Sequence, residues 1–169
     1  MDVFEAVRTT LAVRAYRPDP IPDDVLHRIL EAGRLSASAS NQQPWHFVVV
    51  RDREMLKKLG ASASSGPYIA QAPLAVVVAT DKKSRFGVSD ASRAIQSMLI
   101  TAWADGVGSN WVGFGGMEKA RTLLDIPASL DVLAVLPFGY PARAVGKGKK
   151  QRKALHEVAH NEKYGKPFE

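Results

Sequence analysis

The sequence predicts a single α+β domain, with one central mixed sheet covered by helices on both sides, in three layers. Three observations support this prediction. Apolar residues recur at helical spacing in several segments, β-branched apolar runs of strand length lie between them, and neither a repeat nor a linker divides the 169 residues. The elements are spaced too irregularly for a doubly wound parallel sheet. We therefore expect residues 1–169 to form one domain.

Two helices are predicted at the beginning of the chain. Phe4, Val7 and Leu11 fall at helical spacing, and we expect this first helix to end near Ala12. The prolines of residues 17–22 then predict a rigid turn before a second helix. The apolar face of that second helix contains Val25, Leu26, Ile29, Leu30 and Gly33.

Strands and helices then follow one another along the rest of the chain. Residues 46–51 and 74–79 are predicted strands, separated by an amphipathic helix near 53–59. The strongest helical pattern covers residues 90–105, which carry apolar residues almost all round the helix. Later elements are a strand at 110–113, a helix at 118–124, a strand at 131–138 and a short helix at 154–163.

Composition and charge exclude several classes of protein. No apolar run is long enough to span a bilayer, and residues 1–11 mix charged with apolar side chains, unlike a signal peptide. The chain has no cysteine, which excludes disulfides, thiolate metal sites and thiol catalysis. We therefore expect a cytoplasmic protein that does not bind membranes.

Positive charge is concentrated near the C-terminus. The chain has a net charge of +6, and residues 143–169 contain eight Lys or Arg against three Glu. Such a tail is either a solvated surface or an anion site, for example for a phosphate. It has few aromatic residues to stack on bases, so we do not expect a nucleic-acid partner.

The most informative segment is a small polar loop at residues 38–45, which reads Ser-Ala-Ser-Asn-Gln-Gln-Pro-Trp. It offers hydroxyl, amide and backbone N–H groups at the edge of the strand predicted at 46–51. Polar donors held by a rigid strand suit a planar polar ligand. The alternative is a solvated turn.

Four motifs, in order, resemble the nitroreductase family. The loop matches the family's Ser-x-x-Asn-x-Gln-Pro-Trp, and residues 13–16 resemble the end of its Arg-Arg-Ser-x-Arg-x-Phe/Tyr motif. Residues 106–113 are similar to the strand whose following backbone faces the flavin. The fourth motif pairs Gly139-Tyr140-Pro141 with the basic residues of Lys150-Gln151-Arg152.

The resemblance implies a flavin mononucleotide (FMN) oxidoreductase in an intertwined homodimer. Electrons would pass from NADH or NADPH through FMN to small oxidised acceptors such as nitroaromatics or quinones, in a ping-pong reaction. No catalytic side chain and no metal is expected, because flavin N5 carries the chemistry. The central helix at 90–102 is similar to the family's dimer-axis helix.

The resemblance also assigns residues to the cofactor. Arg14 would lie near the pyrimidine edge, the loop would contact the ring or ribityl chain, and a backbone N–H near Gly113 would face N5. A surface salt bridge is the alternative for Arg14, and a plain turn is the alternative at Gly113. The implied cofactor-binding residues are Arg14, Ser38, Ala39, Ser40, Asn41, Gln43, Gly113, Phe114, Gly115, Lys150 and Arg152.

One departure from the family leaves alternatives open. Thr10-Leu11-Ala12 stands where the family has Arg-Arg-Ser, so two cations and a hydroxyl near the phosphate are missing. Arg8 is the nearest replacement along the helix. FMN would then bind weakly, another flavin would be used, or the protein would bind a flavin or other ligand without turnover.

A second motif competes with the flavin interpretation. Residues 156–160 read His-Glu-Val-Ala-His, which fits the zinc-binding His-Glu-x-x-His. On a helix, His156 and His160 would share one face and could bind zinc, with Glu157 as base. The position in the tail and the missing third ligand weigh against a zinc hydrolase.

Overall fold

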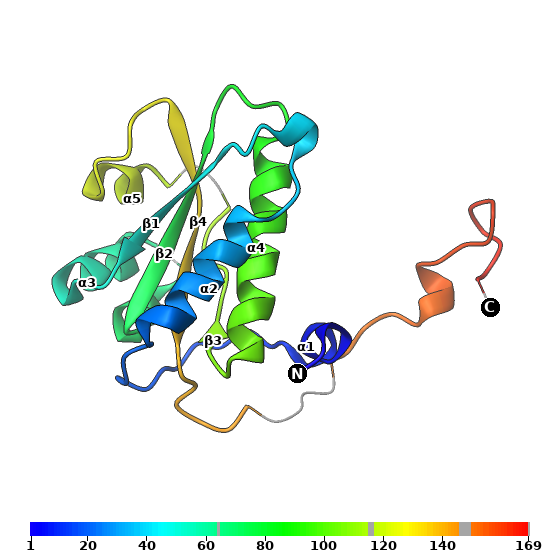
Figure 1. Cartoon of the computed structure of the whole chain (residues 1–169), viewed down its shortest axis with the longest axis horizontal. Coiled ribbons are helices and arrows are strands. Elements are labelled where there is room, and N and C mark those ends of the chain that lie inside the picture. The colour runs from blue at the N-terminus through cyan, green and yellow to red at the C-terminus, as the bar shows by residue number, and fades with distance from the viewer. Residues whose placement is uncertain (64, 115–116, 146–149, 169) are drawn as a thin grey trace.

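The computed structural model describes residues 1–63, 65–114, 117–145 and 150–168 (Figure 1). Its strands form one sheet in the order β1-β2-β4-β3. The strands are β1 (Trp45–Val50), β2 (Leu74–Asp81), β3 (Gly108–Ser109) and β4 (Leu130–Gly139).

All three strand pairs are antiparallel, so the prediction of a mixed sheet needs correction. Among the described residues, the only parallel pairing is an isolated bridge between Ala12 and Ser109. Helices interspersed with strands suggested parallel crossovers. A connection that contains a helix can nevertheless return the chain in either direction, so the sequence pattern does not determine strand direction.

Helices cover both faces of the sheet and confirm the predicted three-layer α+β fold (Figure 1). On one face, α2 (Asp23–Arg34) and α4 (Gly87–Ala104) bury Ile29 and Met98 against the sheet. On the other face, α3 (Arg53–Ser62) and α5 (Glu118–Leu123) bury Leu56 and Ala120. Apolar positions alternate along β2, where Val76 and Val77 belong to opposite cores, as the pleat of a strand requires.

The long helix α4 is buried on one side only. Ala91, Ala94, Ile95, Met98 and Ala102 are fully buried. The opposite side of the helix carries partly exposed apolar residues, namely Leu99, Ile100 and Trp103.

The N-terminal helix and the start of the C-terminal tail lie at the same end of the molecule. The first helix, α1 (Val3–Thr9), lies beside the C-terminal end of α4, and residues 150–168 extend away from the sheet (Figure 1). The predicted helix at 154–163 is wrong. The segment forms only one short 3-10 turn, Leu155–Glu157, because no apolar surface of the described chain covers its exposed Leu155 and Val158.

The strand predicted at 110–113 is also wrong. The regular strand is Gly108–Ser109, and beyond it only Val112 pairs, through a single bridge to Val135. The side chain of Asn110 instead donates to the hydroxyl of Tyr68. No helix among the described residues has the length and apolar character that crossing a bilayer requires.

Candidate functional site

The polar loop between α2 and β1 has a strained backbone. Ser40, Asn41 and Gln43 have φ values of 49°, 54° and 49°, in the left-handed region that residues with a side chain rarely adopt. Each such residue costs on the order of 1–3 kcal/mol and persists only where its surroundings hold it. Strain of this kind is concentrated at ligand sites, which supports the prediction that the loop binds a ligand.

The loop closes on itself through its polar side chains. The backbone N–H of Gln43 donates to Oγ of Ser38 at 2.9 Å, and Nε2 of Gln43 donates to Oδ1 of Asn41 at 3.1 Å. Ser38 therefore holds the loop in shape. Ser40 is exposed, and its side chain makes no hydrogen bond to a described residue, so this hydroxyl is available to a ligand.

Helix α4 anchors the same loop from outside. The backbone N–H of Ala39 donates to Oδ2 of Asp90 at 3.1 Å, and Ser36 Oγ lies 2.8 Å from Ser97 Oγ. Asp90 is fully buried, and its Oδ1 lies 3.2 Å from the guanidinium of Arg93. Sequence reasoning missed Asp90 because an acid in the first turn of a helix ordinarily indicates only a helix start.

A basic cavity lies beside the stretch that lacks the family's cations. It has a volume of about 320 Å³ and brings Lys150 and Arg152 next to Thr10, Leu11 and Ala12. The remaining lining residues are Val7, Gln96, Leu99, Ser109, Asn110 and Trp111. The two sequence motifs, distant along the chain, therefore meet in one place.

Lys150 is held at this cavity by a specific contact. Its Nζ donates to the backbone carbonyl of Val7 at 2.6 Å. Partial burial and the nearby charge of Arg152 lower the pKa of Lys150. An anion bound in the cavity would oppose both effects, because it stabilises the charged form of Lys150. Arg8, the alternative cation, is already paired with Glu5 at 2.8 Å. Among the described residues that line this cavity, the positive charges therefore come from Lys150 and Arg152 of the tail.

Arg14 is exposed beside a buried tyrosine. The hydroxyl of Tyr16 donates to the carbonyl of Val13 at 2.6 Å, and burial raises the pKa of Tyr16, so the phenol stays protonated. This contact fixes the segment that carries Arg14. Within the described part of the chain, the guanidinium of Arg14 makes no hydrogen bond or ion pair, so the alternative of a surface salt bridge is not observed.

The turn at Gly113 is held by a tryptophan. Gly113 has a φ of 85°, and its carbonyl accepts a hydrogen bond from the indole N–H of Trp111 at 2.6 Å. In a trans peptide the C=O and the next N–H point in opposite directions, so Trp111 also sets the direction of the Phe114 N–H. The ring of Phe114 is exposed, 6.3 Å from that of Trp111. Gly115 lies outside the described residues.

The candidate residues form separate groups within one chain. The loop contacts Asp90, whereas the basic cavity is lined by Leu99, nine residues later. Nine residues are two and a half turns, about 14 Å along the helix axis, so the two contacts lie on opposite faces of α4. Figure 1 shows the loop at the N-terminal end of α4 and α1 at its other end.

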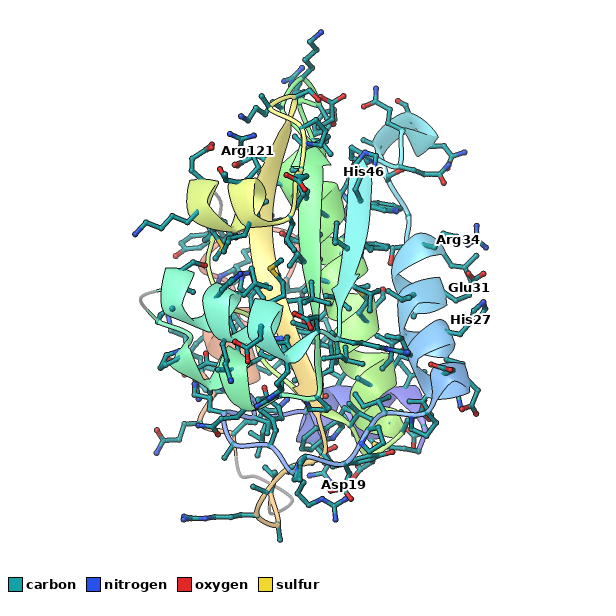
Figure 2. The ribbon with its side chains drawn as sticks, turned by 90° about the vertical axis from the view of Figure 1, so that its left-hand side faces the viewer. Asp19, His27, Glu31, Arg34, His46 and Arg121 are labelled. Atoms are coloured by element: carbon teal, nitrogen blue, oxygen red, sulfur yellow. The ribbon has the colours of Figure 1, made fainter. Side chains whose placement is uncertain are left out.

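The histidines do not form a metal site with other described residues. No group of three His, Asp or Glu side chains that could hold a metal occurs within the described ranges. Figure 2 shows His27 beside the exposed Glu31–Arg34 pair on α2, with His46 apart from it on β1.

The helical face that the zinc hypothesis requires does not form. Only Leu155–Glu157 has a helical turn, so His156 and His160 are not one turn apart on an α-helix. The Glu157 carboxylate accepts a hydrogen bond from the backbone N–H of Ala154 at 2.7 Å, and the His160 ring packs on Tyr164 with ring centroids 4.5 Å apart. These contacts order the tail locally.

Comparisons with known proteins agree with the fold. A relative from Methanothermobacter thermautotrophicus is 37% identical over 154 residues, covering 86% of this chain and 81% of that protein. It carries the provisional name NADH dehydrogenase/NAD(P)H nitroreductase. The FMN reductase [NAD(P)H] of Bacillus subtilis is 25% identical, over 96% of this chain and 74% of that protein.

A solved structure and a family model give the same assignment. A Bacteroides thetaiotaomicron crystal structure with the same provisional name superposes with a TM-score of 0.88 and 28% identity, covering 96% of this chain and 98% of that one. The model of the Nitroreductase family matches residues 7–76 and 61–140. The chain therefore belongs to the Nitroreductase family.

Proposed function

We propose that residues 1–169 form one FMN-binding domain of an oxidoreductase, which passes electrons from NADH or NADPH to small oxidised acceptors such as nitroaromatics or quinones. Family membership and the names of the FMN reductase and NAD(P)H nitroreductase relatives support this function. The observation that carries it is the basic cavity, where Lys150 and Arg152 lie beside Thr10-Leu11-Ala12 and restore the positive charge that a phosphate needs.

The remaining polar groups fit the other parts of FMN. Lys150 and Arg152 would hold the phosphate, and Arg14 has an unpaired guanidinium for the pyrimidine edge. The strained loop at 38–43 offers hydroxyl and amide groups to the ring or ribityl chain. The N–H of Phe114 would face N5, with its direction fixed through the neighbouring carbonyl.

When bound, FMN supplies the electron transfer at N5, and the protein contributes binding, orientation and electrostatics. A cation at the pyrimidine edge stabilises the anionic reduced ring, so Arg14 would make the cofactor easier to reduce. The rigid turn at Gly113 holds one donor in place without side-chain acid or base.

The site would be completed by a second copy of the chain. Because the loop and the basic cavity lie on opposite faces of α4, a cofactor that contacts both needs groups from two chains. Three observations support a homodimer. The α1 helix exposes Val3 and Phe4, α4 leaves Leu99 and Trp103 partly exposed, and the extended tail exposes Leu155. Large apolar side chains that are exposed together are typical of interfaces.

One observation favours a second candidate function, a flavin- or ligand-binding protein without turnover. Thr10-Leu11-Ala12 contributes no cation, so the phosphate would depend on an exposed tail that Lys150 joins to α1. A weakly held cofactor is compatible with binding alone, and the same experiment separates the two functions.

The test is the visible spectrum of the purified protein mixed with FMN and passed through gel filtration. We expect a retained flavin band, which anaerobic NADH or NADPH bleaches and a nitroaromatic or quinone restores. A retained band that neither nucleotide bleaches would favour the second candidate. A colourless protein that ignores both FMN and FAD would contradict the proposed function and the flavin-binding form of the second candidate.

A further inference from the structure

Asp90 is a buried carboxylate whose position calls for an explanation. Its side chain is fully buried in the first turn of α4, where removing a charge from water is costly. Its Oδ1 makes no hydrogen bond, and its only charged partner among the described residues is Arg93, which is itself half exposed. Placing a carboxylate here costs stability, so its contacts indicate what it does.

Asp90 does not cap its own helix. The N-cap of α4 is Phe86, which makes no side-chain hydrogen bond, and within the described chain no N–H of α4 donates to the Asp90 carboxylate. The hydrogen bond that Asp90 does make runs to another element, from the backbone N–H of Ala39 to Oδ2. Its role is therefore tertiary.

The contact falls at the point where the loop becomes strained. Ala39 immediately precedes Ser40 and Asn41, which have left-handed φ values. Two further contacts join α4 to the loop, and both lie earlier. Arg93 Nη1 lies 3.3 Å from the carbonyl of Ala37, and Ser97 contacts Ser36. Asp90 is thus the α4 residue that holds the loop beside its strained positions.

We propose that Asp90 is a positioning residue of the flavin site, which acts through Ala39 to fix the direction of Ser40 and Asn41. This proposal rests on the proposed function, because it assumes that the loop contacts the flavin. A charged acceptor forms a stronger hydrogen bond than a neutral one, and a strained loop persists only where such contacts hold it.

The test compares three variants by their dissociation constants for FMN and for riboflavin, which lacks the phosphate. Asp90→Ala should weaken both ligands equally, by about tenfold to a hundredfold, because the loop would contact the part that both share. Asp90→Asn keeps an acceptor oxygen for the Ala39 N–H and should recover most of the affinity. Ser97→Ala removes the contact of the same helix with Ser36, before the strained positions, and should weaken both ligands much less than Asp90→Ala does.

Hydrogen exchange of the Ala39 amide in the flavin-free protein provides the structural readout. We expect protection in the wild-type protein and in Asp90→Asn, and its loss in Asp90→Ala. If Asp90→Ala does not fold, Asp90→Asn with Arg93→Ala is compared with Arg93→Ala alone, because Arg93 also contacts the loop at Ala37. The double variant should bind both flavins between about twofold and tenfold more weakly than that single variant.

Three outcomes would overturn the proposal. One is wild-type affinity for both flavins in Asp90→Ala or, if Asp90→Ala does not fold, equal affinities in the double variant and in Arg93→Ala. Another is an equal loss in Ser97→Ala, which would show that general docking of the loop matters and not this carboxylate. The third, a wild-type protein that binds neither flavin, would remove the proposed function itself and is distinguishable from the first two.

Discussion

Lys150 Nζ donates a hydrogen bond to the backbone carbonyl of Val7 at 2.6 Å, joining the C-terminal tail to the first helix. This contact brings the densest positive charge of the chain to the stretch Thr10-Leu11-Ala12, where the family's cations are missing. We propose that the tail supplies the positive charge that this stretch lacks. The tail is therefore part of the candidate site.

Replacing Arg152 with Ala should weaken FMN far more than riboflavin. A hydrogen bond to a charged group contributes roughly 1.5–3 kcal/mol, so FMN affinity should fall by about tenfold to a hundredfold. Titration of each flavin by fluorescence measures this difference. Lys153→Ala, which removes an exposed cation that is not among the residues lining the cavity, is the control. Equal losses for both flavins in Arg152→Ala would indicate a structural role.

The preference for FMN over riboflavin should also weaken at alkaline pH. Burial and Arg152 lower the pKa of Lys150. Its positive charge should therefore be lost at a lower pH than that of a free lysine, whose pKa is about 10.4. The ratio of FMN to riboflavin affinity should therefore begin to fall below that pH, and the ratio cancels ionisation of the ring. Lys150→Arg, which stays charged, should flatten the profile. A flat wild-type profile would remove Lys150 from the phosphate site.

Substituting Phe4 with Glu should produce monomers. Phe4 is 74% exposed in the single chain, so a charge there costs little within one copy but would be buried at the proposed interface. Light scattering at micromolar concentration should give half the wild-type mass, with flavin lost at the same time. Val49→Glu on β1, also partly exposed, is the control. A wild-type protein that is monomeric with flavin bound would refute the dimer.

Relieving the backbone strain of the loop should stabilise the fold and weaken flavin binding. Glycine adopts the left-handed conformation of Ser40 without penalty, so Ser40→Gly should raise the free energy of unfolding of the flavin-free protein by up to about 1 kcal/mol. Flavin affinity should fall because the free hydroxyl is lost. Chemical denaturation and flavin titration measure the two effects. A destabilised variant would show that the Ser40 side chain makes contacts that support the fold.

Much of the fold could be predicted because local patterns agree with tertiary burial. The periodic apolar residues of α4, from Ala91 to Ala102, are the ones buried against the sheet. The run at 74–79 becomes β2, buried on both faces. The loop at 38–43 is polar and exposed as expected, because its Ser, Asn and Gln side chains satisfy one another.

Features that depend on distant contacts could not be predicted. The Asp90–Ala39 bond joins residues 51 positions apart, and nothing local distinguishes Asp90 from an ordinary acid at a helix start. The strand predicted at 110–113 is another case, since the pairing residues are Gly108, Ser109 and Val112, while the Asn110 side chain donates a hydrogen bond to Tyr68, far away in the sequence. The helix expected at 154–163 has suitable residues but no surface of its own chain to cover it.

Complementation between two damaged chains is the most direct test of the central claim, that one flavin site takes its loop and its basic cavity from different copies. One chain carries Ser40→Ala and Asn41→Ala, and the other carries Lys150→Ala and Arg152→Ala. Each homodimer should bind FMN weakly, because every site is damaged. In doubly tagged heterodimers, symmetry leaves one site with both halves intact and the other with both halves damaged.

The measurement is the FMN stoichiometry and affinity of the purified heterodimer. We expect one FMN per dimer, bound with wild-type affinity, while both parent homodimers remain weak. Heterodimers that bind FMN as weakly as their parents would show that each chain completes its own site, and would contradict the account.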